Sequence, residues 1–494
     1  MNTYKKILKF LLSLSGCISI LLYLSLKTIK NTIGTLEINQ LIWALRLNNK
    51  GLDKNILLLY LAYLAIAVFI CFIYCVAIYK HKQILKLFFY SYIKKKSFYV
   101  SFSLKVKTLY PILGTFMLAI ITNFGYHSFQ RVNESADLIF FFKNNFAKSY
   151  PKVDFIKDNY YVPKIDEVTF NQKKNIVIIL VESFENTFFN KLNPHHLNTK
   201  IDLNGSLSFA NFKQYSGTNL TIGALTAWHF GLPLILPLKD WNSYDKQYFL
   251  PYAISVFDIL KYHGYKNYLL LGSDKDYSGQ KNLFVQHGDF LIKDKNYWIK
   301  NHFSLDEFKG TGWGFRDSFV LKKGIEQYKE LLKANCSFAL VIETIDTHAP
   351  NGFAPKEFTK FNDLRDPIEY VDSEIALFVN EFKIINDPNT SLMILGDHNF
   401  MGKSKILDTT VQRTIFNAIY SNKNTWSVNK IQENVSALDI APTILDLCGA
   451  QWSRKQFGLG FSLYSKEKSL AEKMGEQELN KNLNQKSKFY DRFF

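Results

Sequence analysis

The sequence predicts an α/β fold with a largely parallel central sheet, preceded by transmembrane helices. Short uninterrupted apolar runs of strand length recur after residue 172, amphipathic helical patterns lie between them, and three long uncharged runs occupy the first 130 residues. Parallel strands appear as continuous apolar runs because helices cover both faces of their sheet. Strands that alternate with helices indicate βαβ units.

The three uncharged runs near the N-terminus cover about residues 10–26, 55–79 and 108–130. A helix needs roughly 20 apolar residues to cross a bilayer, so each run predicts one transmembrane helix. A signal peptide is the alternative for the first run, but no cleavage site of small residues follows it. We therefore expect residues 1–130 to form a multi-pass membrane domain.

The positive charge of the chain is concentrated in that membrane domain. The formal net charge is +17, and residues 1–107 hold sixteen Lys or Arg against two acids. Membrane topology explains this distribution better than nucleic-acid binding does, so we expect no nucleic-acid partner. Lysines at the N-terminus and in the loop between the second and third runs are expected to face the cytoplasm. Everything after residue 130 would then lie on the extracytoplasmic side of the plasma membrane.

The remaining chain divides into three predicted segments. Residues 131–172 are a linker or shoulder with turn signals at Pro151 and Pro163, residues 173–465 form the α/β domain, and residues 466–494 are a polar C-terminal tail. In the α/β domain the predicted strands are 175–181, 266–271, 337–345 and 391–395, and the predicted helices include 222–231, 256–263, 318–333 and 369–383.

Three of the predicted strands finish in carboxylates, two of them with a histidine close by. The residues at these ends are Glu182, Glu343 with Asp346 and His348, and Asp397 with His398. Active sites of parallel sheets gather beyond the carboxyl ends of the strands. A single acid there is usually a helix cap or solvated, but three together favour a site for a divalent cation such as Mn²⁺, Mg²⁺ or Zn²⁺.

A nucleophile is available just before the predicted helix at 222–231. Thr218 and Thr221 both lie there, where free backbone N–H groups and the helix dipole favour an anion. A nearby metal would favour the alkoxide further. Threonine before a helix is also a common N-cap, and the local sequence does not choose between the two threonines.

Taken together, these motifs are similar to those of the sulfatase-like branch of the alkaline phosphatase superfamily. Within it the chain resembles the lipoteichoic acid synthases and, more closely, the bacterial glucan phosphoglycerol transferases. The resemblance covers roughly residues 35–465. The segments that carry it are NIVIILVESFE (175–185), SGTNLTIGALTAWHFGLPL (216–234), GYKNYLLLGSDKDYSGQKNLFVQHGDF (264–290), WGFRDSFVL (313–321), ETIDTHAPNGF (343–353) and LGDHN (395–399).

The resemblance implies a site at particular positions. One divalent metal, most often taken as Mn²⁺ with Mg²⁺ or Zn²⁺ as alternatives, would be held by Glu182, Thr221, Asp397 and His398. Thr221 would be the catalytic nucleophile. His348 matches a histidine that contacts the transferred head group, and the positions near that pocket are Trp313, Arg316 and Asp274.

The implied activity is transfer of a phosphoglycerol head group from phosphatidylglycerol to an extracytoplasmic glycan, through a covalent intermediate on the metal-bound threonine. This chain differs from the lipoteichoic acid synthases in two ways, and both differences favour simple head-group transfer over polymer synthesis. The lipoteichoic acid synthases carry an arginine where this chain offers Gln280 and Lys281, and they have more membrane spans.

Two other functions stay open at this point. A phosphoethanolamine transferase of the same superfamily is the nearest, although those enzymes usually carry more extracellular cysteines. A catalytically inactive, membrane-anchored glycan-binding protein is the second, and the intact set of predicted metal ligands argues against it. A true sulfatase would need a Cys or Ser in a C/S-x-P-x-R motif, which is missing. The sequence identifies neither the acceptor glycan nor the oligomeric state.

Overall fold

The computed structural model describes residues 150–235, 248–304, 313–402, 404–421 and 434–494, together with Ala65 and Val68, which are helical. From residue 150 onward the described residues belong to one compact unit. The predicted transmembrane helices lie outside the described residues, apart from those two positions in the second. Within the described part of the chain, no helix has both the length and the apolar character needed to cross a bilayer.

A seven-stranded sheet forms the centre of this unit, in the order β3-β9-β8-β2-β7-β5-β6. Five of its strands are mutually parallel: β2 (Asn175–Val181), β5 (Lys266–Leu271), β6 (Leu291–Lys293), β7 (Phe338–Glu343) and β8 (Thr390–Gly396). Both remaining pairings, at the other edge, are antiparallel and involve β9 (Asn417–Tyr420) and β3 (Ser206–Leu207). The structure thus confirms the predicted α/β fold with a largely parallel sheet.

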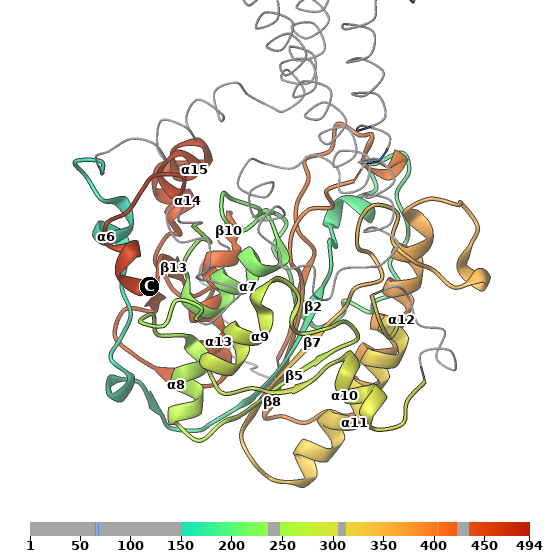
Figure 1. Cartoon of the computed structure of the whole chain (residues 1–494), viewed down its shortest axis with the longest axis horizontal. Coiled ribbons are helices and arrows are strands. Elements are labelled where there is room, and N and C mark those ends of the chain that lie inside the picture. Colours follow the sequence, from blue (N-terminus) through green and yellow to red (C-terminus); the bar gives the residue numbers. More distant parts are fainter. Residues whose placement is uncertain are drawn as a thin grey trace, which may run out of the picture. The chain divides into compact units, whose positions relative to one another are not determined.

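Helices cover both faces of the sheet (Figure 1). One face carries α7 (Thr221–Phe230), α8 (Val256–Tyr262), α9 (Gln280–Gln286) and α13 (Ile440–Leu447), and the other carries α10 (Lys295–Lys300), α11 (Asp317–Lys333) and α12 (Arg365–Ile385). Along β2, Ile176, Ile178 and Leu180 pack into the first core. Val177, Ile179 and Val181 pack into the second. This two-sided burial is why the strand is apolar throughout.

Short paired segments complete the fold. Two-residue strands form three further pairs: β1 (Thr169–Phe170) with β11 (Ala450–Gln451), β4 (Phe212–Lys213) with β10 (Val435–Ser436), and β12 (Gln456–Phe457) with β13 (Gly460–Phe461). Gly231 is the C-cap residue that follows α7. It has φ 61°, and a Cβ there would lie 2.1 Å from the Phe457 carbonyl oxygen. Glycine therefore lets the end of α7 pack directly on this hairpin.

The C-terminal segment, expected as a polar tail, is folded onto the same unit. It forms α14 (Leu470–Met474), α15 (Glu476–Leu483) and a short 3₁₀ helix (Tyr490–Phe493), whose buried apolar side chains include Leu479 and Leu483. It also joins α6 (Phe155–Asn159): the Asp154 carboxylate accepts hydrogen bonds from Ser487 Oγ at 2.6 Å and from Phe489 N at 3.0 Å. The two ends of the described chain are thereby tied together.

Candidate metal centre and active site

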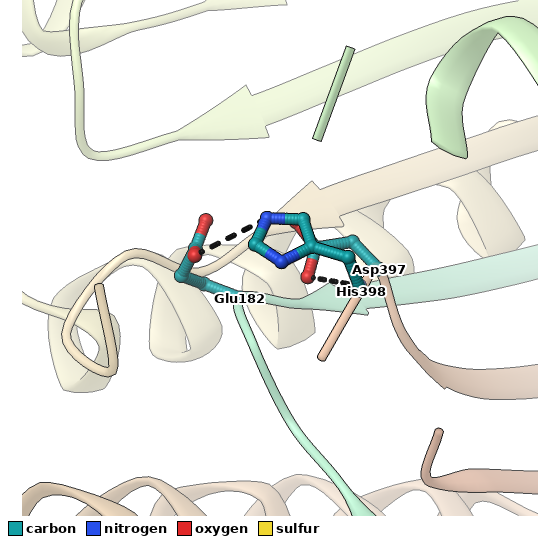
Figure 2. A group of neighbouring side chains, drawn as sticks. All are labelled: Glu182, Asp397 and His398. Atoms are coloured by element: carbon teal, nitrogen blue, oxygen red, sulfur yellow. Dashed lines mark hydrogen bonds and ion pairs between the residues drawn. The ribbon is translucent and has the colours of Figure 1, made fainter. Parts of the chain in front are cut away.

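Two neighbouring strands deliver the central acidic residues. Strands β2 and β8 are parallel, with Val181 paired to Gly396, so Glu182 and Asp397 leave the sheet side by side. His398 follows Asp397. One ligand atom from each of these three side chains lies within 4.8 Å of the others. Figure 2 shows the three side chains converging at the strand ends, and each is at most 3% exposed.

The Thr221 hydroxyl lies at the same place. Its Oγ1 is 3.3 Å from Glu182 Oε2 and 3.4 Å from His398 Nε2. Thr221 is the first residue of α7, and the cap position is Leu220, so the threonine side chain is not used as an N-cap. Thr218 is engaged elsewhere, because its hydroxyl donates to Tyr215 O at 2.8 Å and accepts from Tyr215 N at 3.1 Å. Thr221 therefore lies at the cluster, while Thr218 closes a buried turn.

The donor set of this cluster fits a divalent cation. Asp397 Oδ1 accepts from the backbone N–H of Ser183 and of His398, both at 2.7 Å, whereas the buried Oδ2 has no hydrogen-bond partner. The His398 Nδ1 lies 2.9 Å from Asn399 O, which leaves Nε2 directed to the acids, 3.7 Å from Glu182 Oε1. Two carboxylates, an imidazole nitrogen and a hydroxyl are suitable ligands for Mn²⁺, Mg²⁺ or Zn²⁺.

Electrostatics favour a cation at this position. Burial, and then the charge of Glu182, raise the pKa of Asp397 to about 7. Burial by itself would lower the pKa of His398, but Asp397 and Glu182 outweigh burial, so the pKa of His398 is raised. Two carboxylates that share a buried site repel each other when both are ionised, and a bound cation would relieve that repulsion.

The residues predicted for the head-group pocket are partly brought together. The Trp313 ring lies 4.7 Å from the His348 ring and 5.3 Å from the Tyr277 ring, measured between centroids. The Arg316 guanidinium carbon lies 4.0 Å above the Phe353 ring. Asp274 joins this group through its backbone, because its carbonyl oxygen accepts from Tyr277 N at 3.1 Å. Its two carboxylate oxygens accept from Asp276 N at 2.9 Å and Asn296 Nδ2 at 3.1 Å, which closes the turn after β5.

A third buried acid, Glu343, lies at the end of β7. Glu343 pairs in register with Leu180, two residues before Glu182. Its Oε1 accepts from Gln280 Nε2 at 2.7 Å, and its Oε2 is buried without a hydrogen-bond partner. Burial raises the pKa of Glu343 to about 8. The strand-end rule pointed to Glu343, but nothing in the sequence pointed to its pairing with Gln280.

Asp317 and Asp346 are buried residues that the sequence analysis did not connect. The Asp317 carboxylate accepts from Ile345 N at 2.8 Å and Asp346 N at 3.0 Å, and Asp346 Oδ2 accepts from Asp317 N at 2.9 Å. This reciprocal arrangement fixes the loop with His348 against the start of α11, where Arg316 lies. The sequence does place an acid, Asp317, directly after Arg316 at the start of a predicted helix. Acids are common in the first turn of helices, so this position alone did not indicate a pairing with Asp346.

Residues 174–450, more than half of the chain, match the Sulfatase family model, and the chain belongs to this family. It is also 28% identical over 318 residues to phosphoglycerol transferase I of Escherichia fergusonii and 29% identical over 309 residues to phosphoglycerol transferase I of Escherichia coli O127:H6. These matches cover 60% and 59% of this chain. They cover 39% of each relative, so the chain spans about two fifths of the length of the relatives it matches.

Solved structures with some similarity include the lipoteichoic acid synthase LtaP of Listeria monocytogenes, with a TM-score of 0.49 and 15% identity, covering 63% of this chain and 81% of that one. The lipooligosaccharide phosphoethanolamine transferase EptA of Neisseria meningitidis has a TM-score of 0.48 and 13% identity, covering 92% of this chain and 87% of that one.

Proposed function

We propose that this chain is a metal-dependent transferase that moves a phosphoglycerol head group from a phospholipid, phosphatidylglycerol, to a glycan outside a bacterial plasma membrane. The observation that carries the proposal is the meeting of Thr221 Oγ1 with Glu182, Asp397 and His398 at the carboxyl end of the sheet. The relatives named phosphoglycerol transferase I support the choice of transferred group.

The proposed ligands of one divalent ion, with Mn²⁺ as the leading candidate, are Glu182, Thr221, Asp397 and His398. When bound, the ion supplies positive charge that stabilises anionic oxygens during phosphoryl transfer. Two features support this assignment: Asp397 Oδ2 is buried without a hydrogen bond, and His398 Nε2 faces the other proposed ligands, 3.4 Å from Thr221 Oγ1 and from Asp397 Oδ2.

Thr221 is the proposed nucleophile of a two-step transfer. In the first step a bond forms between Thr221 Oγ1 and the lipid phosphorus, and the bond from phosphorus to the diacylglycerol oxygen breaks. Diacylglycerol leaves with the proton that the threonine gave up. In the second step a glycan hydroxyl displaces Thr221 from phosphorus, and its proton returns to the threonine. Position at the N-terminus of α7 favours the negative charge that develops there.

The side chains near Trp313 are proposed to bind the head group. Trp313 and His348 offer adjoining rings, against which a short polyol can lie, and Arg316 can donate to phosphate oxygens. Asp274 is proposed as a peripheral residue that shapes the same pocket. A lipid donor also gives a reason for the predicted N-terminal membrane domain, with the described unit on the extracytoplasmic, periplasmic side.

The donor can be tested directly. Membranes that contain the chain would be incubated with Mn²⁺ and either phosphatidylglycerol or phosphatidylethanolamine, each labelled in the head group. We expect label to move from phosphatidylglycerol to a glycan acceptor. Label movement from phosphatidylethanolamine alone would contradict the proposal. A chain that binds metal and glycan but moves neither label would be the inactive binding protein instead.

Substitution of the nucleophile gives a second test. Thr221→Ala should lower transfer by roughly 10³-fold or more, because it removes the hydroxyl on which the proposed covalent intermediate forms. The matched control is Thr218→Ala, which removes the turn hydrogen bonds to Tyr215. The control should lower the thermal stability while the folded protein stays active. Equal activity of Thr221→Ala and the wild type would exclude Thr221 as the nucleophile.

A further inference from the structure

We propose that Glu185 and Arg413 are positioning residues that hold the two loops carrying the metal ligands together and thereby set the affinity for the metal. This inference rests on the proposed metal centre. Its readout is metal binding, which is measured separately from head-group transfer.

The first loop, residues 182–185, and the second, residues 397–400, are joined at both ends. At the near end, Ser183 N donates to Asp397 Oδ1 at 2.7 Å, and at the far end Phe400 N donates to Glu185 Oε1 at 2.8 Å. Ser183 has φ 51°, a left-handed conformation that is costly for a residue with a Cβ. These two contacts hold the loops of Glu182 and His398 together, and they do so although Ser183 in the first loop has a conformation that is not intrinsically favoured.

The end of β8, just before the second loop, also packs closely on the first loop. A Cβ on Gly396 would lie 2.1 Å from the Phe184 carbonyl oxygen, so only glycine fits at that position. Phe416 N in turn donates to that carbonyl oxygen at 3.0 Å. The spacing of the loops is therefore fixed by backbone contacts on one side and depends on the Glu185 side chain on the other.

Arg413 binds both loops at their far end, through Glu185 and Phe400. Glu185 is fully buried, and Arg413 Nε donates to its Oε2 at 2.9 Å, while a second guanidinium nitrogen bonds Glu185 Oε1. That nitrogen also donates to Phe400 O at 2.6 Å. The backbone next to Arg413 is anchored as well, since Asn186 N donates to Thr414 O at 2.9 Å. One guanidinium therefore contacts both ligand loops at once, in the bidentate geometry that arginine provides.

The position of this pair points to an effect on the metal site as well as on the fold. Glu185 is three residues from Glu182, and Phe400 is two residues from His398. Loss of Arg413 would leave a buried carboxylate without its counter-charge next to ligands that must stay in register. Groups that orient metal ligands typically change metal affinity by about 10- to 100-fold when they are removed.

The test compares four variants of the full chain in detergent micelles, by calorimetric titration with Mn²⁺ and by thermal unfolding. Arg413→Met should raise the Mn²⁺ Kd by about 10- to 100-fold and lower the Tm. Glu185→Gln/Arg413→Met removes both charges, so most of the Tm should return while the Kd stays raised. Arg413→Lys keeps the positive charge but loses the bidentate geometry of the guanidinium. Its Kd for Mn²⁺ should lie between those of the wild type and Arg413→Met.

Arg365→Met is the matched control. Arg365 also forms a two-fold ion pair, with Asp363, at 2.9 and 2.8 Å, and it is the first residue of α12 rather than a part of the segments joined to the ligand loops. This variant should bind Mn²⁺ as the wild type does. If the double variant regains wild-type affinity together with its Tm, the pair is merely structural and the proposal is wrong. Absence of Mn²⁺ binding in the wild type would also overturn it, whereas a wild type that binds Mn²⁺ but transfers no head group would overturn only the proposed function.

Discussion

Buried carboxylates crowd the carboxyl edge of the sheet, and their charges shape what the site can do. Glu182, Asp397, Glu343 and Asp346 are each at most 5% exposed. Burial raises the pKa of Asp397 and of Asp346 to about 7 and that of Glu343 to about 8. Near neutral pH, Asp397, Asp346 and Glu343 therefore retain a large share of the protons that an exposed acid would have released, because their pKa values are raised.

Metal affinity should depend on pH because protons compete for Asp397. A ligand carboxylate with a pKa raised to about 7 in the metal-free protein must lose its proton before it binds. The raised pKa of His398 acts in the same direction. We expect the Mn²⁺ affinity to be highest near about pH 8 and to fall by about tenfold or more for each pH unit below 7. Titration calorimetry at several pH values would measure this, and a constant affinity would contradict the proposed ligands.

Glu343→Gln should stabilise the protein at high pH and not at low pH. With its pKa raised from 4.5 to about 8, the folded state binds this proton more tightly than the unfolded state does, so wild-type stability falls as pH rises from about 4.5 to 8. The variant lacks this loss, and its advantage should approach about 5 kcal/mol above about pH 8, at about 1.4 kcal/mol for each pKa unit. Thermal unfolding across this range would show the difference. The exposed Glu357→Gln should show none, and an equal effect of both variants would contradict the account.

The sequence could predict only part of this site. Glu182, Asp397 and His398 follow buried parallel strands, so the strand-end rule brought them together. Thr221 is on a helix 39 residues further along the chain than Glu182, and its place at the cluster is a result of tertiary packing. The ion pair of Glu185 with Arg413 spans 228 residues, and no local pattern marks it.

Among the elements, prediction succeeded where burial is two-sided and failed where strands are short. The predicted strands 175–181 and 266–271 have the observed bounds, because their apolar runs begin and end with the sheet. The antiparallel β9, with four residues, gives too little pattern to recognise. The C-terminal segment was expected as a polar tail because charged residues outnumber its few apolar anchors. Those anchors, including Tyr490 and Phe493, are buried.

Tyr490→Phe should show that the C-terminal segment stabilises residues 233–235, which follow α7. The Tyr490 hydroxyl donates to Pro233 O at 3.0 Å and accepts from Ile235 N at 3.3 Å. Its removal leaves backbone groups without these partners, so we expect a loss of about 1–2 kcal/mol in the free energy of unfolding. Denaturant unfolding would measure this loss of stability. Tyr252→Phe is the control because that side chain is exposed. Equal losses for both variants would contradict a stabilising role of the Tyr490 hydroxyl.

For the whole molecule, the charge distribution separates two parts of the chain. Residues 1–107 carry sixteen of the Lys and Arg residues and two acids, whereas the described unit from residue 150 onward mixes both signs in many ion pairs. This asymmetry supports the proposed arrangement of an N-terminal membrane domain and an extracytoplasmic catalytic unit, since positive charge gathers on the cytoplasmic side.

Reporter fusions would test that orientation. A C-terminal alkaline phosphatase fusion, which is active only outside the cytoplasm, should be active in cells that express the full chain. A C-terminal green fluorescent protein fusion exported through the general secretory route should stay dark. The opposite pattern would place the catalytic unit in the cytoplasm, away from an extracytoplasmic glycan, and would contradict the proposed location.

The central claim is that Thr221 carries the phosphoglycerol group during transfer. The most direct measurement is peptide mass mapping after the full chain has been incubated with phosphatidylglycerol and Mn²⁺, without an acceptor glycan, and quenched in acid. We expect a phosphoglycerol adduct on the peptide that contains Thr221, at the threonine that contacts Glu182 and His398. Release of diacylglycerol with the adduct on another residue would contradict it.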